Sequence, residues 1–451
     1  MRGWLYEQLW RSKSRLTKLG IANVLDFLSA SQYWTPSQIQ DLRDRKLHDI
    51  VSHAYNHIPF YRRLLDERGV KPQNIEGIHD LPKLPVVTKE MLRNHWRELR
   101  ARDLPDCDVY FSQTGGTTGV PMRIARDRAS DVWGTACYVR GLGWAGLTLR
   151  EKRVRLFGGT LGTEPARKFD GLRRWFRGEL FLPAFELGPH NFGDCAAQIR
   201  RSRAQFLIGY ASACHSLAML SEAEGGSLTF TAVFPTAELC PASWAEAIAR
   251  VFSAKVLPYY GCGEVNSLAY CCSEGVYHIC DEHAAIEVED EAGKISREGD
   301  GAFVITDLDN RAMPIIRYRN GDAGQVAGPG CRCGRSLGRI LRLDGRVNDM
   351  LVTTSGSKFS GVIATHTFRL IDHVESYQVL QRAPGHATIR IVRGHGYDPR
   401  VEEPKIYKIF RRHLGPGSDV VIEYVTSVDK TPAGKARFVI NEYLNAAGAE
   451  R

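Results

Sequence analysis

The sequence predicts a protein of mixed α/β and α+β class, with a large N-terminal domain of layered sheets and a small, mobile C-terminal α+β domain. Three observations lead to this fold class. Short β-prone runs alternate with helical stretches as far as Tyr270, strand-like runs without long helices follow, and a Gly- and Cys-rich stretch precedes a compact final segment. The length of 451 residues fits a large domain and a smaller one, since domains typically have about 150 residues.

The first part of the chain is expected to be helical and then α/β. Between residues 47 and 97, apolar residues recur at helical spacing and Pro-marked turns separate the helices. Four β-prone runs come next: RVRLFGG, AQFLIGY, FTAVFPTAE and AKVLPYYG. The helical stretches ACYVRGLGWAG, SACHSLAMLSEAE and ASWAEAIARVF lie among them. This alternation predicts a parallel sheet covered by helices.

Beyond Tyr270 the pattern changes to strands joined by polar turns. The runs AAIEVED, GAFVITDLD and IIRYRNGDAGQV favour an antiparallel sheet or a barrel. The segment GPGCRCGRSLGRI then precedes DGRVNDM, and a strand-like VVIEYVTSV lies near the end of the chain. We therefore expect two domains, residues 1–344 and 345–451.

Composition and charge narrow the class of protein. Hydrophobic residues make up 43% and charged residues 25%, as in a folded globular protein. The formal charge of +9 suits a polyanion such as ATP or coenzyme A, whereas the scattered basic residues form no pattern typical of nucleic-acid recognition. No run approaches the roughly 18 apolar residues of a membrane span, so a cytoplasmic protein is expected. The 11 cysteines then indicate reduced thiols or metal ligands.

A Gly- and Thr-rich segment is the first candidate for chemistry. Residues 112–121, SQTGGTTGVP, directly follow the strand-like run DVYF. Such a loop can bring backbone N–H groups and hydroxyls close to phosphate oxygens. It is not the common G-x-x-x-x-G-K-[ST] loop, because no Lys-Ser or Lys-Thr follows its last glycine. Taken alone, it could also be an ordinary surface turn.

Several motifs in order resemble the adenylate-forming superfamily of acyl-CoA synthetases, in its phenylacetate-CoA ligase and CapK-like branch. The resemblance covers nearly the whole chain. Its motifs are YNHIPFYRRLL, LPVVTKEMLR, TGGTTGVP, IGYASA, YYGCGE, VITDLDNRAMPIIRYRNGD, CRCGR, GRVNDML and DKTPAGKAR.

This resemblance implies a role for each matching residue. Glu264 is the expected acid that holds Mg²⁺, and Lys435 is the mobile lysine that reaches the carboxylate and the α-phosphate during adenylation. Tyr260 is expected against adenine, Asp322 on the ribose hydroxyls and Arg346 at the domain junction. The remaining expected ATP-binding residues are Thr114, Gly115, Gly116, Thr117, Thr118, Gly119, Glu238 and Gly261.

The chain also departs from the family pattern. Val120 stands where the family often has a lysine, which leaves Arg123 as the nearest cation to the phosphate loop. Asn348 precedes Asp349 where two acidic residues are usual at the junction. The segment TTSGSKFSGV keeps Gly356 but lacks the branch's usual acceptor-tunnel pattern. The acceptor is therefore the open part of the expected reaction.

A metal site and an acyl pocket complete the expected sites. Three thiolates and one imidazole suit tetrahedral Zn²⁺, although Cys271 could replace Cys272 and free buried thiols are the alternative. The expected zinc ligands are Cys272, His278, Cys331 and Cys333. By analogy with the family, aromatic residues in the pocket favour an aryl or arylalkyl acid, or are core residues. The pocket is expected near the helix with Trp133, Tyr138 and Trp144, the turn at Gly209 and Tyr210, and Thr236, Ala237, Tyr259 and Cys262.

The sequence thus predicts an ATP- and Mg²⁺-dependent ligase that activates a small-molecule carboxylic acid as its acyl-adenylate and releases pyrophosphate. Transfer to a thiol, expected to be that of coenzyme A, would follow. The alternatives are an amine or carrier-protein acceptor, and a non-catalytic scaffold of the same fold. No nucleic-acid or membrane partner is expected, and a homodimer is one option for the oligomeric state.

Overall fold

The helices at the start of the described chain are set by their terminal residues. In this computed structural model, α2 (Ile21–Ser31) is followed by α3 (Pro36–His57). Thr35 and Gln38 form a capping box at the start of α3, and Pro36 occupies its first position. Pro59 starts α4 (Pro59–Glu67) and, because the residue before a proline disfavours helical geometry, Ile58 separates the two helices.

The structure describes most of the chain, with gaps. The described residues are 20–105, 108–113, 122–157, 177–184, 187–226, 228–240, 242–346, 350–360, 364, 367–368, 371–394, 396–429 and 438–444. The chain divides into a large unit, which holds most residues up to 343, and a small unit, which holds most residues from 344 onward together with 321–323. Among the described residues, no helix is both long and apolar enough to cross a membrane.

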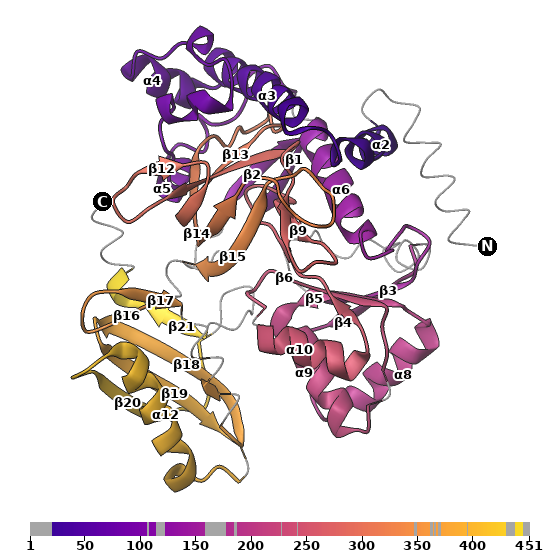
Figure 1. The fold of residues 1–451 in the computed structure, drawn as a ribbon, viewed down its shortest axis with the longest axis vertical. Helices are drawn as coiled ribbons and strands as arrows, with labels where there is room; N and C mark the ends of the chain where they lie inside the picture. Colours follow the sequence, from indigo (N-terminus) through magenta and orange to yellow (C-terminus); the bar gives the residue numbers. More distant parts are fainter. Residues whose placement is uncertain are drawn as a thin grey trace. The chain divides into compact units, whose positions relative to one another are not determined.

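A five-stranded parallel sheet in the large unit has the strand order β4-β3-β5-β6-β7. Its two faces bury different cores: Leu207 and Val233 face one cluster, whereas Ile208 and Phe234 face the other. Helices α8, α9 and α10 cover the first face (Figure 1), and α2 and α6 contribute to the core on the second. The strands are β3 (Arg153–Phe157), β4 (Glu179–Pro183), β5 (Phe206–Tyr210), β6 (Ala232–Thr236) and β7 (Lys255–Val256), and the helices are α6 (Arg128–Gly143), α8 (Phe192–Ser202), α9 (Ala211–Ala223) and α10 (Ala242–Phe252).

An eight-stranded sheet follows in the same unit, with the order β12-β11-β13-β14-β15-β10-β9-β8. Its pairs β8–β9, β9–β10, β10–β15, β11–β12 and β11–β13 are antiparallel, as the sequence predicts for the region after Tyr270. The strands are β8 (Tyr259–Tyr260), β9 (Ala269–Cys271), β10 (Tyr277–Ile279), β11 (Ala284–Glu289), β12 (Ile295–Ser296), β13 (Gly299–Asp307), β14 (Tyr318–Ala327) and β15 (Arg339–Arg346).

One predicted strand is in fact divided between the two sheets. The run AKVLPYYG forms β7 at the edge of the parallel sheet and then β8 at the edge of the antiparallel one. Pro258 lies between them, and its carbonyl accepts a hydrogen bond from the N–H of Cys271 at 3.1 Å. The chain therefore changes sheets within four residues of Val256, which brings the end of β6 close to β8.

The N-terminal helices share a core with the eight-stranded sheet. Leu47 and Val51 of α3 and Phe60 of α4 are buried in the same cluster as Ile286 and Ile305. Val87 pairs with Tyr318 in a parallel bridge, just before α5 (Lys89–Asn94). Two short 3₁₀ turns (Pro72–Asn74 and Ile78–Lys83) and the hairpin of β1 (Val109–Gln113) and β2 (Arg123–Asp127) complete this region.

The small unit has its own sheet and core. Strands β18 and β19 are antiparallel, whereas β20 and β21 add in parallel at the two edges, in the order β20-β19-β18-β21. Helix α12 (Pro399–Leu414) contributes Ile406 and Phe410 to a core that includes Ile389 and Ile391. The remaining strands are β16 (Met350–Val352), β17 (Lys358–Ser360), β18 (Val374–Ala383), β19 (His386–Arg393), β20 (Asp419–Tyr424) and β21 (Val439–Asn441).

Candidate active site and metal cluster

The predicted nucleotide-binding residues fall partly inside and partly outside the described chain. Outside it lie Lys435, Asn348, Asp349 and the loop from Thr114 to Val120. Arg346 ends β15, and only its backbone is described. The structure therefore locates five of these candidates with their surroundings: Glu238, Tyr260, Gly261, Glu264 and Asp322.

Glu264 lies in a tight loop between β8 and β9. The N–H of Cys262 donates to the carbonyl of Val265 at 3.3 Å, and the N–H of Leu268 donates to the carbonyl of Tyr260 at 3.2 Å. Ser267 adopts a positive φ of 59° and its hydroxyl donates to the Gly134 carbonyl at 2.7 Å. The loop is thus closed on itself and fastened to α6, so that the Glu264 backbone has a defined position.

The Glu264 carboxylate is buried among polar groups of other segments. Only 6% of the residue is exposed. The hydroxyl of Tyr318, at the start of β14, donates to Glu264 Oε1 at 3.0 Å, and Lys89 Nζ lies 3.9 Å from the same oxygen. A buried carboxylate needs such partners, because burial without them would neutralise it.

Arg126 of β2 fixes the same loop. Its guanidinium donates to the carbonyls of Gly263 at 2.7 Å and Glu264 at 3.2 Å, and to the hydroxyl of Ser112 at 2.7 Å. Because Ser112 belongs to β1, which leads into the Gly- and Thr-rich segment, Arg126 links that segment to Glu264. Sequence reasoning missed Arg126, Lys89 and Tyr318; Lys89 and Tyr318 do lie within the quoted motifs LPVVTKEMLR and RYRNGD.

Arg123, the nearest predicted cation to the phosphate loop, rests on aromatic rings. Its guanidinium carbon lies 4.1 Å from the ring centre of Phe111 and 5.0 Å from that of Trp96. The Trp96 indole N–H also donates to the Arg123 carbonyl at 2.8 Å. These contacts hold the side chain against the rings of Phe111 and Trp96 by cation–π attraction.

The expected adenine and ribose residues lie on two strands of the eight-stranded sheet, β8 and β14. Tyr260 on β8 is 7% exposed, and its hydroxyl accepts a hydrogen bond from the Asn320 side chain at 2.7 Å. Its ring meets Phe303 edge-on at 5.9 Å. Asp322 lies two residues beyond Asn320 on β14 and is 9% exposed.

Of the aromatic residues predicted for the acyl pocket, Tyr138 and Tyr259 come together. Their ring centres lie 5.9 Å apart, and Tyr270 stacks on Tyr259 at 5.3 Å with an angle of 14° between the rings. Burial raises the pKa of the phenols of Tyr138 and Tyr259, so both stay neutral at pH 7. These three rings, Tyr138, Tyr259 and Tyr270, are called the tyrosine cluster below.

Tyr270 is the member that sequence reasoning missed, and its position is strongly constrained. Its hydroxyl donates to Ser267 Oγ at 2.9 Å. Its ring packs directly on Gly141 of α6, where an added Cβ would lie 2.1 Å from the ring. Glycine is therefore required at position 141 for this ring to occupy its place.

The other predicted pocket residues are distributed around the cluster. Trp133 packs on Phe27 and beneath the Lys46 ammonium, whereas Trp144 reaches the cluster only at the edge of Tyr270, with ring centres 6.5 Å apart. Tyr210, at the end of β5, packs on Phe157, and Cys262 belongs to the loop of Glu264.

The carboxyl ends of β5 and β6 meet at one edge of the parallel sheet, where ligands of such sheets commonly bind. Tyr210 pairs with Thr236, whose hydroxyl donates to the Tyr259 carbonyl at 3.2 Å. Ala237 follows with a positive φ of 63° and an exposed side chain. Glu238 Oε2 accepts a hydrogen bond from the N–H of Ser212 at 2.9 Å, in the first turn of α9. The Glu238 carboxylate thus accepts a hydrogen bond from the N-terminal turn of α9.

The four predicted zinc ligands form one cluster, although two sequence segments supply them. Their ligand atoms all lie within 4.8 Å of one another. Cys272 Sγ is 3.8 Å from Cys331 Sγ, and Cys333 Sγ is 3.1 Å from His278 Nε2. Cys271, the alternative, belongs instead to an apolar core. The cluster residues are Cys272, His278, Cys331 and Cys333.

The surroundings of this cluster suit a bound cation. Burial, and secondly the charge of Arg335, lowers the pKa of His278 to about 4, so its imidazole is neutral at pH 7 and able to bind metal. In a tetrahedral zinc site with Zn–S bonds of about 2.3 Å, the sulfur atoms of two thiolate ligands lie about 3.8 Å apart. The separation of the Cys272 and Cys331 sulfur atoms, 3.8 Å, matches this value.

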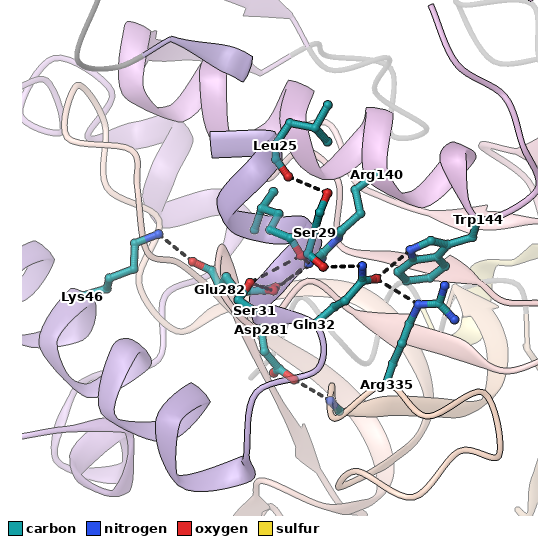
Figure 2. Close-up of polar contacts among 12 residues, drawn as sticks. Leu25, Ser29, Ser31, Gln32, Lys46, Arg140, Trp144, Asp281, Glu282 and Arg335 are labelled. Atoms are coloured by element: carbon teal, nitrogen blue, oxygen red, sulfur yellow. Dashed lines mark hydrogen bonds and ion pairs between the residues drawn. The ribbon is translucent and has the colours of Figure 1, made fainter. Parts of the chain in front are cut away.

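A polar layer made by Gln32, Trp144 and Arg335 joins the ends of α2 and α6 to the segment that follows Cys333 (Figure 2). The Gln32 side-chain oxygen accepts hydrogen bonds from the Trp144 indole at 2.9 Å and from Arg335 Nε at 3.0 Å. Arg335 also lies over the Trp144 ring, 4.2 Å from its centre, and Trp144 meets His278 edge-on at 5.7 Å. The residues of the cluster are thus held against the helices that cover the parallel sheet.

Next to this layer lies a buried ion pair. Arg140 of α6 binds Glu282 with both nitrogens, at 2.6 and 3.2 Å, and neither side chain is more than 2% exposed. Ser31 donates to the same carboxylate at 2.7 Å, and Lys46 donates to the Glu282 carbonyl at 2.6 Å (Figure 2). Full pairing is what makes this burial tolerable.

Comparison with known proteins finds relatives of the kind that the sequence motifs predict. The CapK C-terminal domain family matches residues 351–442. Phenylacetate-coenzyme A ligase of Thermus thermophilus is 28% identical over 77% of this chain and 79% of its own. Protein CapK of Staphylococcus aureus is 21% identical over 89% of each chain. A crystal structure of 2-hydroxyisobutyryl-CoA ligase shares the fold, with a TM-score of 0.71, 17% identity and coverage of 93% of this chain and 94% of that one. The chain is therefore similar to phenylacetate-coenzyme A ligases and to protein CapK over most of its length, and it shares the fold of an adenylate-forming coenzyme A ligase.

Proposed function

We propose that this protein uses ATP to activate a carboxylic acid as its acyl-adenylate, releases pyrophosphate, and transfers the acyl group to a thiol. The observation that carries the proposal is the buried Glu264 carboxylate, held by Tyr318 in a loop that Arg126 links to the Gly- and Thr-rich segment. The kinship with phenylacetate-coenzyme A ligases supports the same reaction class.

Each residue has a distinct task in this proposal. Glu264 would hold Mg²⁺, a hard cation that prefers carboxylate oxygens and neutralises triphosphate charge. Amides and hydroxyls of residues 114–119 grip the β- and γ-phosphates, and Asp322 accepts hydrogen bonds from the ribose hydroxyls. Lys435 reaches the substrate carboxylate and the α-phosphate, where a fixed ammonium offsets charge as the oxygen attacks phosphorus.

The tyrosine cluster supports an aryl or arylalkyl acid. Two of its members come from α6 and β8, beside the carboxyl end of β6, and the three rings supply flat apolar surfaces at fixed angles. The phenol of Tyr138 stays neutral, because burial raises its pKa, so it does not repel an incoming carboxylate as a phenolate would.

Coenzyme A is the favoured acceptor, since the phenylacetate-coenzyme A ligases among the relatives are named for it, whereas the name of protein CapK gives no acceptor. Because the segment from Thr353 to Val362, which contains Gly356, departs from the family pattern, an amine or a carrier-protein thiol is the alternative acceptor. Incubation of the protein with ATP and a panel of aryl and alkyl acids, each with coenzyme A or with simple amines, followed by mass spectrometry, identifies the acid and the acceptor. Pyrophosphate release without any acyl product would leave only the first half-reaction, and release with no acid at all would contradict the proposal.

We further propose that the cysteine and histidine cluster holds one structural Zn²⁺. Four protein ligands leave no position for substrate or water, so the ion would support the fold of this region rather than the chemistry. Metal analysis should find about one zinc per chain, which is lost in a variant with both Cys331→Ser and Cys333→Ser. Zinc content that is nil in the wild type, or unchanged in the variant, contradicts this assignment.

A further inference from the structure

A second group of metal-ligating side chains lies on the N-terminal helices, away from the cysteine cluster and the loop of Glu264. His53 and His57 are one turn apart on α3, with ring centres 4.9 Å apart. Asp103, which follows α5, places Oδ2 3.8 Å from His53 Nδ1 and 3.6 Å from His57 Nδ1. The three ligand atoms all lie within 4.8 Å of one another.

The hydrogen bond on the far side of His53 determines which of its nitrogen atoms can bind a metal. Its Nε2 lies 2.9 Å from the carbonyl oxygen of Arg311. Because a carbonyl oxygen only accepts, Nε2 carries the hydrogen, and the neutral ring has its lone pair on Nδ1, which faces Asp103. Metal-binding histidines usually make this kind of second bond, which fixes the ring. His53 is also 8% exposed, so its orientation is set by packing.

The separations between these groups fit a shared ion better than direct contact. At 3.6 and 3.8 Å, the two imidazole–carboxylate distances exceed normal hydrogen-bond lengths. Two ligands bonded to one ion at about 2.0–2.2 Å are instead separated by about 3–4 Å. The side chains of His57 and Asp103 are 40% and 36% exposed, so an ion could enter from solvent and keep water in its remaining positions.

We propose that His53, His57 and Asp103 bind a divalent transition-metal ion, in a two-histidine, one-carboxylate site that is separate from the nucleotide and cysteine sites. Neutral imidazoles with one carboxylate suit Zn²⁺, Ni²⁺ and Co²⁺. The ion would join the end of α3 to residues 101–105, a segment that the Ala101 N–H already ties to the Ala312 carbonyl at 2.9 Å. The proposal does not depend on the proposed reaction.

The test is titration of the full chain with Co²⁺ after removal of loosely bound metal. Cobalt bound to thiolates has an intense sulfur-to-metal absorption, whereas cobalt bound only to nitrogen and oxygen has none, so the two clusters are distinguished in one spectrum. We expect about one equivalent without the thiolate absorption. His57→Ala and Asp103→Asn should each weaken it at least about ten-fold, because even the loss of an outer-shell partner has this effect.

A matched control comes from the small unit. His386 Nδ1 lies 3.5 Å from Asp419 Oδ2, and both side chains are more exposed than those of His57 and Asp103. Among the described residues, no second imidazole joins this pair in a cluster. The variant His386→Ala should therefore bind Co²⁺ like the wild type. In a separate thermal unfolding experiment, added Ni²⁺ should raise the melting temperature of the wild type but not that of His57→Ala. Equal uptake by wild type and His57→Ala, or no uptake beyond the thiolate-bound ion, overturns the proposal.

Discussion

The central strands of the parallel sheet differ from the eight-stranded sheet in the charges that they bury. The central strands of the parallel sheet, β5 and β6, read FLIGY and AVFPT and carry no charged residue. The eight-stranded sheet and its turns bury carboxylates and cations instead. Arg317, for example, binds Glu287 with two nitrogens at 2.9 and 3.0 Å and donates to the Leu84 carbonyl at 2.7 Å.

In the proposed function, these two regions have two different tasks in recognition. At the carboxyl end of β6, the apolar sheet lies close to the tyrosine cluster, whose rings would contact an apolar acyl group. The charged sheet carries Asp322 on β14, and the loop between its strands β8 and β9 carries Glu264; these are the residues that we propose to bind ribose and a metal ion. Buried charges are costly unless paired, so the second region must be rigid where it holds them. Changes that remove a partner in one region should therefore affect different properties from changes in the other.

The largest effect is expected at the ion pair that joins α6 to the turn before β11. Glu282→Ala leaves Arg140 buried without its carboxylate, which should cost about 3–5 kcal/mol of unfolding free energy. Glu222→Ala is the matched control, because Glu222 also binds an arginine, Arg250, with both oxygens but on the surface, where solvent screens such a pair and its contribution to stability is small. Denaturant unfolding of the wild type and of both variants measures the two losses in unfolding free energy. Equal losses would mean that burial of the pair has no special role.

The next effect concerns catalysis rather than stability. Glu264→Gln keeps the shape and the Tyr318 contact but removes the charge that would hold Mg²⁺, so the rate of adenylate formation should fall by about 10²-fold or more. Glu289→Gln, on the same sheet but paired with the exposed Arg319, serves as control. Rates are measured by pyrophosphate release at saturating ATP. If the control loses as much activity, Glu264 has no particular function.

A smaller effect is expected for ribose binding. Asp322→Ala removes two charge-assisted hydrogen bonds to the ribose, each worth about 1.5–3 kcal/mol before water recovers part of the loss. Calorimetry should find weaker binding of both ATP and a non-hydrolysable acyl-adenylate mimic. Asp300→Ala, whose carboxylate pairs with the exposed Arg342, should bind like wild type. Wild-type affinity in the Asp322 variant would make this residue a turn residue only.

The smallest effect is expected on the apolar side. Gly141→Ala would place a methyl group 2.1 Å from the Tyr270 ring, which must move and shift Tyr259 with it. Such overpacking costs about 1–3 kcal/mol of stability and should change the preference among acids of different size. Gly143→Ala, on the same helix, meets nothing within 4 Å and is the control. An unchanged acid preference in Gly141→Ala would separate the tyrosine cluster from the acyl pocket.

Much of the fold could be predicted from local pattern, and the contacts between distant segments could not. Helices and strands follow the periodicity of the sequence, but AKVLPYYG is one apolar run that Pro258 divides between two sheets. Sequence motifs predicted Glu264 and Tyr260 as site residues. The contacts of Tyr318, Arg126 and Tyr270 depend on tertiary structure, so no motif predicted them. The pairing of His57 with Asp103 likewise has no local signal, since 46 positions separate them in the chain.

The central claim is that this protein forms an acyl-adenylate, and acid-dependent exchange of labelled pyrophosphate into ATP tests it most directly. The wild type should catalyse exchange with at least one acid of an aryl and alkyl panel. Lys435→Ala should reduce exchange by about 10²-fold or more but spare acyl transfer from a supplied adenylate, whereas Lys430→Ala, five positions earlier, should change neither. Exchange that is absent with every acid, or that is equal in the wild type and Lys435→Ala, would contradict the account.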